Sequence, residues 1–252
     1  MPFTFVRKSW VANRVCHNDL KGDPNMDTQI KMTTALPQSA IEVTIVSDVM
    51  CPWCIIGYRQ LEQAMADTGI NASIRWEPFE LNPDMPVTGQ NTSEHIQQKY
   101  GSTPEQSEQS RAQMKTLGES LGFAFNWTPK THMWNTFITH QLLEFALSEG
   151  KQHQLKLALF EAHFTDQRDL SQTDVLVDIA ATVGLDTDKA KRIIESGELG
   201  AITREKQQYW QARGITGVPS MIFGGKYLVT GAQGVAAYTD ILKRTAAEAA
   251  TV

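Results

Sequence analysis

The chain has 252 residues, and its 28 acidic and 23 basic side chains give a formal net charge of −5 at pH 7. This mildly acidic balance lacks the basic surface that binds nucleic acid or anionic membranes, so we expect neither as a partner. The hydrophobic fraction of 41% is enough for a buried core, and no apolar run approaches the roughly 18 residues of a membrane-spanning helix. Three cysteines are too few for a disulfide-stapled secreted protein. We therefore expect a cytoplasmic globular protein, and the sequence leaves open whether it is a monomer or a homodimer.

Residues 1–40 differ from the rest of the chain. They mix charged and turn-forming side chains, and their longest apolar run is Trp10-Val11-Ala12. That run is too short for the apolar core of a secretory signal peptide. We expect either a poorly ordered tail or a misassigned start, with Met26 or Met32 as the natural first residue. Cys16 lies in this segment and has no assigned role.

The next forty residues predict a strand, a helix and a second strand. Residues 41–46 alternate apolar and polar side chains, which is typical of a strand. Apolar residues then recur every three or four positions from Ile55, which indicates one face of a helix. Pro52 is suited to the first position of that helix and Gly69 to its end. Alternation returns over 72–76, so residues 41–79 predict a parallel βαβ unit.

The middle of the chain predicts helices, and the end returns to β structure. Helical spacing begins at Thr103-Pro104, and Ser171-Gln172-Thr173-Asp174 resembles a capping box before another helix. Near the end, Gly224-Gly225 separates two strand-like runs and predicts a tight hairpin, followed by a helix over 234–249. We expect an α/β sheet domain from 41–90 and 201–250, interrupted by an all-helical insertion domain over 91–200.

Two cysteines stand where the first predicted strand ends and the first predicted helix begins. In Cys51-Pro52-Trp53-Cys54, one helical turn separates the sulfurs and places them within disulfide reach. Free backbone N–H groups and the positive end of the helix dipole favour a thiolate over a thiol at Cys51. We expect Cys51 to be exposed and to attack a substrate disulfide, and Cys54 to face inward and resolve the mixed disulfide.

Two other interpretations of the cysteine pair compete. A zinc site needs four ligands, but the chain has no second C-x-x-C pair and no paired histidine spacing, so we expect no metal. The cysteines could also be inert core residues. A proline between them at a helix start makes that less favoured, although a lone C-x-x-C is only moderately specific.

The segment Gly214-Ile215-Thr216-Gly217-Val218-Pro219 lies just before the predicted hairpin. A proline that enters a strand can have a cis peptide bond. An ordinary trans bond is the more common arrangement, and the residues alone favour it.

These motifs together resemble the DsbA family of thioredoxin-fold oxidoreductases. The finer match is to its FrnE-like branch, through Asp48-Val49-Met50 before the cysteine motif, then Trp76-Glu77-Pro78-Phe79-Glu80-Leu81-Asn82-Pro83, and finally Val229-Thr230-Gly231-Ala232-Gln233. The resemblance covers about residues 41–246. It implies a thioredoxin-like fold interrupted by the helical insertion, with Cys51 as nucleophile and Cys54 as resolving thiol. It also implies a cis Pro219 packed against the cysteines, with Val218 offering its backbone to an extended substrate.

Two departures from related proteins qualify this resemblance. Strongly oxidising members carry a histidine where Trp53 stands, so this position does not support strong oxidant behaviour, and the direction of exchange stays open. A related branch holds 2-hydroxychromene-2-carboxylate isomerases and kappa-class glutathione transferases. There a serine usually replaces the first cysteine and an Asp-Arg pair follows the glycine of the last hairpin. Cys51 and Ala232-Gln233 stand at those places, which argues against that branch.

Five further polar residues are candidates for the site. Asp48, Glu77 and Glu80 lie near the ends of the first two strands, where a carboxylate could accept the proton of Cys54. Asn135 and His140 begin an insertion helix and are candidates for lining the cleft over Cys51. For each of them a capping, packing or surface role is the more common alternative.

The leading hypothesis is a thiol–disulfide oxidoreductase that uses the Cys51–Cys54 pair, with no metal or organic cofactor. Its expected partners are a disulfide- or thiol-containing protein or peptide, or glutathione as co-substrate. A glutathione-dependent isomerase or transferase acting on an aromatic compound, and a redox-silent peptide-binding or chaperone module, remain alternatives. The sequence does not determine the natural substrate, the direction of exchange or the reduction potential.

Overall fold

The computed structural model describes residues 41–250. The expected tail or misassigned start, together with Cys16, lies outside the described residues. The chain begins with strand β1 (Ile41–Ser47), helix α1 (Pro52–Thr68) and strand β2 (Ala72–Pro78), and it ends with β5 (Ser220–Phe223), β6 (Tyr227–Thr230) and α9 (Val235–Ala249). The predicted order of βαβ followed, after a helical block, by ββα is confirmed.

These four strands form one sheet in the order β2-β1-β5-β6. β1 pairs in parallel with β2, Ile41 facing Ala72, and antiparallel with β5, Val43 facing Phe223. β5 and β6 form the predicted hairpin. Its turn glycines, Gly224 and Gly225, have φ angles of 54° and 65°, which L side chains rarely adopt. The turn chemistry therefore fixes the register of the hairpin.

Between β2 and β5 the chain is mainly helical. Its helices are α2 (Thr92–Tyr100), α3 (Pro104–Ser120), α4 (Phe137–Ser148), α5 (Gln152–Phe160), α6 (Thr173–Thr182), α7 (Thr187–Ser196) and α8 (Gly200–Ala212). The block also contains the two-residue strands β3 (Gln90–Asn91) and β4 (His132–Met133), which pair with each other, and a π-helical turn over Glu161–Thr165. Where one domain ends and the other begins remains a prediction.

The two predicted helix starts in this block have different outcomes. At α3, the Thr103 side chain accepts from the Gln106 amide, while the Gln106 side chain accepts from the Thr103 amide. This is a full capping box. At α6 the predicted capping box is wrong, because Gln172 is the N-cap and caps nothing with its side chain. The Ser171 hydroxyl instead donates to Asp169, whose carboxylate also accepts a hydrogen bond from the Ser171 amide.

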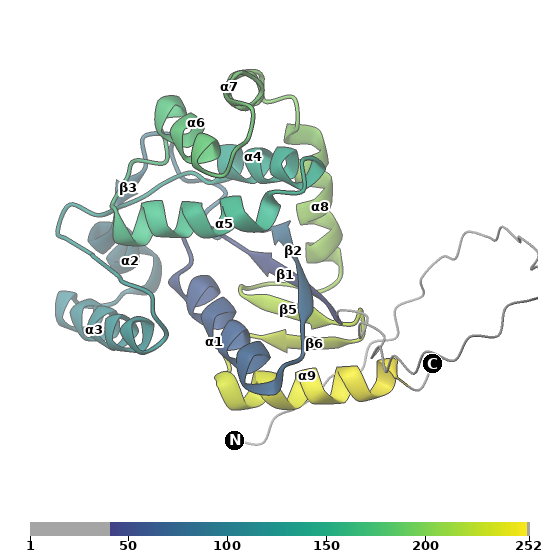
Figure 1. Cartoon of the computed structure of the whole chain (residues 1–252). Helices are drawn as coiled ribbons and strands as arrows, with labels where there is room; N and C mark the ends of the chain where they lie inside the picture. The colour runs from purple at the N-terminus through teal and green to yellow at the C-terminus, as the bar shows by residue number, and fades with distance from the viewer. Residues whose placement is uncertain (1–40, 251–252) are drawn as a thin grey trace, which may run out of the picture.

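Both faces of the sheet are covered. α1 and α9 pack together over one face, where Val43, Ile45, Met221 and Phe223 are fully buried (Figure 1). On the other face Val46 and Ile222 pack with Ile215, which follows α8. A separate apolar cluster joins α4, α5, α6 and α7. Among residues 41–250, no helix is both long and apolar enough to cross a membrane.

The helical block meets the sheet near the start of α1. α5 and α8 contact β2, and Phe160 of α5 belongs to the same apolar cluster as Cys51 and Cys54 (Figure 1). The cysteine motif thus lies where the sheet, α1 and the helical block come together.

Candidate functional site

Cys51 and Cys54 occupy the first turn of α1. Cys51 is the N-cap, with φ −91° and ψ 109°, and Pro52 takes the first helical position. The Cys51 carbonyl accepts a hydrogen bond of 3.0 Å from the Cys54 amide, which begins the helix. Both cysteines are free thiols in this structure. The backbone thus holds the two residues within one helical turn, the spacing that a disulfide between them requires.

The expectation that Cys51 is exposed is wrong. Cys51 is only 4% exposed and Cys54 is fully buried, whereas Trp53 between them is 44% exposed. The cover over Cys51 includes the segment before β5, because the Cys51 thiol donates to the Val218 carbonyl at an Sγ–O distance of 3.6 Å. Cys51 is the one of the pair that keeps any contact with solvent. Cys54 lies further from solvent than Cys51.

The segment that covers Cys51 contains a cis peptide bond between Val218 and Pro219, the geometry that the family resemblance implies. Pro219 also lies close to α1. A Cβ atom at Gly57 would be 3.3 Å from Cγ of Pro219 and 3.2 Å from Cε of Met221. Because Gly57 has no side chain, α1 can approach this segment closely. The close approach holds the cysteine motif at the start of α1 next to the Val218–Pro219 segment before β5.

The surroundings of Cys54 change its acidity. Burial, followed by the hydrogen bond and the charge interaction with Cys51, raises the pKa of Cys54 well above its usual value of 9.0. A buried thiol without solvent resists ionisation. Any reaction that needs the Cys54 thiolate therefore needs a compensating charge or donor nearby.

Asp48 is brought to the cysteines. Its buried carboxylate accepts hydrogen bonds from the amides of Met50, at 3.1 Å, and Leu81, at 2.6 Å. These bonds tie the loop before α1 to the segment after β2. Burial raises the pKa of Asp48 despite these donors.

His140 is also brought to this place, behind Asp48. Its Nε2 donates to the Phe79 carbonyl at 3.0 Å and lies 3.9 Å from Oδ1 of Asp48. Burial holds the pKa of His140 well below its usual value, so the ring is neutral at pH 7. This histidine therefore positions the segment after β2 rather than supplying a charge.

Glu77, Glu80 and Asn135 are held by other partners. Glu77 accepts from Arg75 and from the indole of Trp210, and Glu80 accepts from Arg204 and Gln207 of α8. The Asn135 amide donates to the Met85 carbonyl at 2.8 Å, and its oxygen accepts from the amide of Phe137 at the start of α4. The contacts of Glu77 and Glu80 join β2 and the segment after it to α8, and those of Asn135 anchor the start of α4. Each residue thus makes the kind of packing or capping contact that is its more common alternative role.

Sequence reasoning missed Lys156 of α5. Its side chain is 1% exposed, and its charge acts on Asp48, Cys51 and Cys54. A signal was present, because Gln152, Lys156 and Phe160 are spaced by four and share the buried face of their helix. A lysine on such a face needs an explanation, since lysine is almost never fully buried without a partner.

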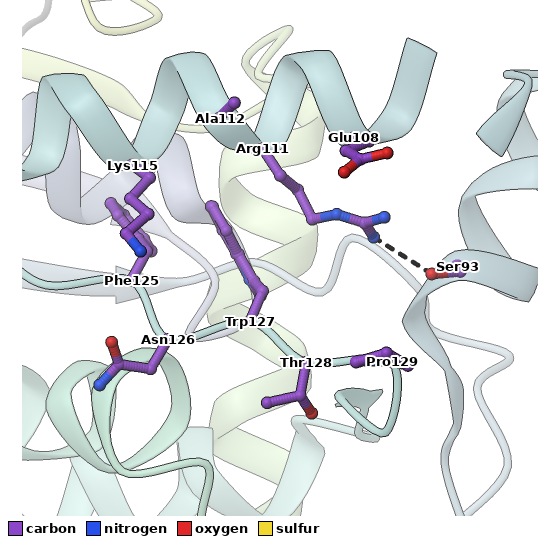
Figure 2. A pocket seen from close by; sticks show the side chains of 10 residues that line it. All are labelled: Ser93, Glu108, Arg111, Ala112, Lys115, Phe125, Asn126, Trp127, Thr128 and Pro129. Atoms are coloured by element: carbon purple, nitrogen blue, oxygen red, sulfur yellow. Dashed lines mark hydrogen bonds between the residues drawn. The ribbon is translucent and has the colours of Figure 1, made fainter. Parts of the chain in front are cut away.

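Two hollows lie beside these elements. One, of about 410 Å³, is lined by residues 81–86 with Gln90, His95 and Lys99, and it begins at the leucine that binds Asp48. The other, of about 480 Å³, lies between α3 and residues 125–129. Figure 2 shows Arg111 and Lys115 extending into it from α3 beside Trp127, with Arg111 donating to Ser93.

Within residues 41–250, no group of three histidine, cysteine or acidic side chains is arranged to hold a metal.

Two known proteins are similar to this chain, one in sequence and one in structure. The uncharacterized protein YwbO of Bacillus subtilis (strain 168) is 25% identical over 195 residues, which is 77% of this chain and 92% of YwbO. The crystal structure of the probable DsbA oxidoreductase SCO1869 from Streptomyces coelicolor matches with a TM-score of 0.76 and 27% identity, over 82% of this chain and 91% of that one.

A more distant structure shares the fold alone. The cytosolic disulfide reductase DsbM from Pseudomonas aeruginosa, solved with GSH, matches with a TM-score of 0.54 and 15% identity, over 81% of this chain and 98% of that one.

The family model of the DSBA-like thioredoxin domain matches residues 42–243, the span that contains the cysteines, the helical block and the hairpin. The chain therefore belongs to the DSBA-like thioredoxin domain family.

Proposed function

We propose that this protein is a cytoplasmic thiol–disulfide oxidoreductase that exchanges disulfides through Cys51 and Cys54. One observation carries the proposal: Cys51 begins α1 beneath the Val218 carbonyl, with the buried Cys54 one turn behind it. The first cysteine keeps a small exposed surface and lies at the positive end of a helix dipole, and the second is held for ring closure. The exchange needs neither a metal nor an organic cofactor, because the sulfurs themselves carry the electrons.

The proposed substrate is a peptide or glutathione disulfide. A peptide would lie along the Val218–Pro219 segment and pair with its backbone, as an added strand does in other recognition sites. Glutathione is supported by DsbM, which was solved with GSH, and by the hollow that begins at Leu81. In that hollow the Lys99 ammonium, now bound to the Leu81 carbonyl and to Asn82, offers a partner for a glutathione carboxylate.

The test compares three serine variants in glutathione disulfide and insulin reduction. Cys51→Ser should abolish turnover, and Cys54→Ser should accumulate a mixed disulfide on Cys51 that mass spectrometry detects. Cys16→Ser, which removes the cysteine outside this motif, is the matched control and should retain turnover. Undiminished turnover by Cys51→Ser ends the proposal. Glutathione-dependent turnover of an aromatic compound that survives Cys54→Ser would instead identify an isomerase or transferase.

A further inference from the structure

Lys156 is a buried cation that the exchange described above does not use. It projects from α5, and its Nζ lies 5.4 Å from the ring centroid of Trp76 and 5.0 Å from that of Phe160. Its side chain is 1% exposed. Burying an ammonium group is costly unless opposite charge or aromatic faces compensate it. Trp76 and Phe160 pack in the same buried cluster as Cys51 and Cys54, so the ammonium lies against the cluster that holds the cysteines.

The charged and titratable groups that face Lys156 come from every element around it. Asp48 lies in the loop after β1, Cys51 is the N-cap of α1, Cys54 lies in its first turn, and His140 lies in α4. Further out, the charge of Arg204 acts on His140, the charge of Asp48 acts on Glu80, and the charge of Cys54 acts on Tyr238 of α9. Among these groups the two cysteines are the ones whose charge changes during disulfide exchange.

The charges support a reciprocal interaction. Burial lowers the pKa of Lys156 to about 8, and Cys54, then Asp48, then Cys51 oppose that shift. In turn the charge of Lys156 lowers the pKa of Cys54 against the effect of burial. At neutral pH Lys156 is therefore mainly an ammonium group, and the thiolate of Cys54 gains most from it.

We propose that Lys156 is a positioning residue of the resolving step, in which its ammonium stabilises the thiolate of Cys54 inside the protein. The proposal rests on the proposed function and deepens it. Cys51 first attacks the substrate disulfide R–S–S–R′, so that a Cys51–S–S–R bond forms and R′–S⁻ leaves. The Cys54 thiol then ionises and attacks the sulfur of Cys51. The Cys51–Cys54 disulfide forms, R–S⁻ leaves, and two protons and two electrons have passed from the dithiol to the substrate as two thiols.

The proposal also gives the helical block a role in the chemistry. Cys54 has no exposed surface, so water cannot stabilise its thiolate. A cation delivered by α5 replaces that solvation with a fixed charge, which in a low-dielectric interior acts more strongly than in water. The first attack, by contrast, uses Cys51 at the helix start and depends less on α5.

Lys156→Met tests the role of the charge, since methionine keeps an unbranched apolar stem and lacks the ammonium. Lys206→Met is the matched control, because Lys206 of α8 is also largely buried but pairs with Glu144. The full chain is reduced, mixed with glutathione disulfide for a single turnover and quenched with an alkylating agent. Mass spectrometry then follows the Cys51–glutathione adduct. We expect Lys156→Met to form the adduct at the wild-type rate and to resolve it at least about tenfold more slowly.

The pH profile separates this role from a structural one. In Lys156→Met the rate of resolution should rise with pH over a range displaced to higher pH than in the wild type and in Lys206→Met, since the Cys54 thiolate has lost its counter-charge. Resolution at the wild-type rate and with the wild-type pH profile overturns the inference. If the wild type itself forms no adduct, the proposed function fails instead, so the two failures are distinguishable.

A measurement on the unmodified chain covers the case in which Lys156→Met does not fold. The side-chain nitrogen resonance of Lys156 is titrated by NMR in the reduced and in the disulfide form of the wild type. Closing the disulfide removes the Cys54 thiol that can ionise beside Lys156, so the upper part of the Lys156 titration, where the thiolate forms, should lie at lower pH in the disulfide form than in the reduced form. The same titration in both forms would overturn the inference.

Discussion

The Gln152 side chain forms two hydrogen bonds with the backbone of Trp76, from which it is separated by 76 residues. Its Oε1 accepts from the Trp76 amide at 3.0 Å, and its Nε2 donates to the Trp76 carbonyl at 2.9 Å. β2 is an edge strand, and these are the backbone groups that a further strand would otherwise pair with. A single side chain of α5 thus completes the sheet edge beside the cysteine site.

Gln152→Ala should lower the free energy of unfolding by about 2–4 kcal/mol, because it leaves a buried N–H and a buried C=O without partners. Gln154→Ala, an exposed glutamine of the same helix, should change it by less than about 0.5 kcal/mol. Urea denaturation measures both. An equal effect in the two variants would show that the Trp76 pairing does not stabilise the fold.

His163 should make stability depend on pH. Burial lowers its pKa from about 6.5 to about 3, so the folded state binds no proton where the unfolded state does. The stability that the neutral ring contributes is present above about pH 6.5 and is lost progressively as the pH falls toward about 3. In this window one such histidine costs about 1.4 kcal/mol per pH unit.

The check is urea denaturation over a pH series. In His163→Leu the slope of the unfolding free energy against pH below about pH 6.5 should be smaller by the uptake of roughly one proton. The buried His140 still contributes to the decline. His132→Gln, at a half-exposed histidine, is the control. A decline in His163→Leu as steep as in the wild type contradicts the assignment.

Trp53→His should make the Cys51–Cys54 disulfide more oxidising. A histidine in the first turn of α1 can donate to the sulfur of Cys51 and stabilise the reduced form. A tenfold gain corresponds to about 30 mV for this two-electron couple. Redox titration against glutathione measures the shift, with Trp53→Phe as the variant that offers no donor. Equal potentials in the two variants would refute the effect.

Gly57→Val should loosen the contact between α1 and the segment that covers Cys51. The first added carbon already meets Met221 at 3.2 Å and Pro219 at 3.3 Å, and overpacking of this kind costs about 1–3 kcal/mol. Gly200→Val in α8, where the first contact is at 3.4 Å, is the control and should cost less. Thermal unfolding compares them, and an unchanged Tm in Gly57→Val would contradict the close approach.

Local patterns were sufficient to predict the strands that carry the site. The alternation over 41–46, the start of a helix at Pro52 and the glycine turn at 224–225 are confirmed because each depends on neighbouring residues and on backbone geometry. The capping box before α6 failed because Asp169, outside the four-residue pattern, accepts the hydrogen bond of the Ser171 hydroxyl. The exposure predicted for Cys51 failed because its cover comes from residues 167 positions further along the chain.

The sequence by itself determined that two thiols stand one turn apart at a helix start, because spacing and proline placement are local properties. Only the tertiary structure decided what surrounds them. It buried Cys54 and Lys156, brought the charge of Lys156 within range of Cys54 and Asp48, and turned Glu77 and Glu80 toward α8. Burial and charge at these sulfurs depend on segments that meet only after the sheet has formed, and no short pattern in the chain records that meeting.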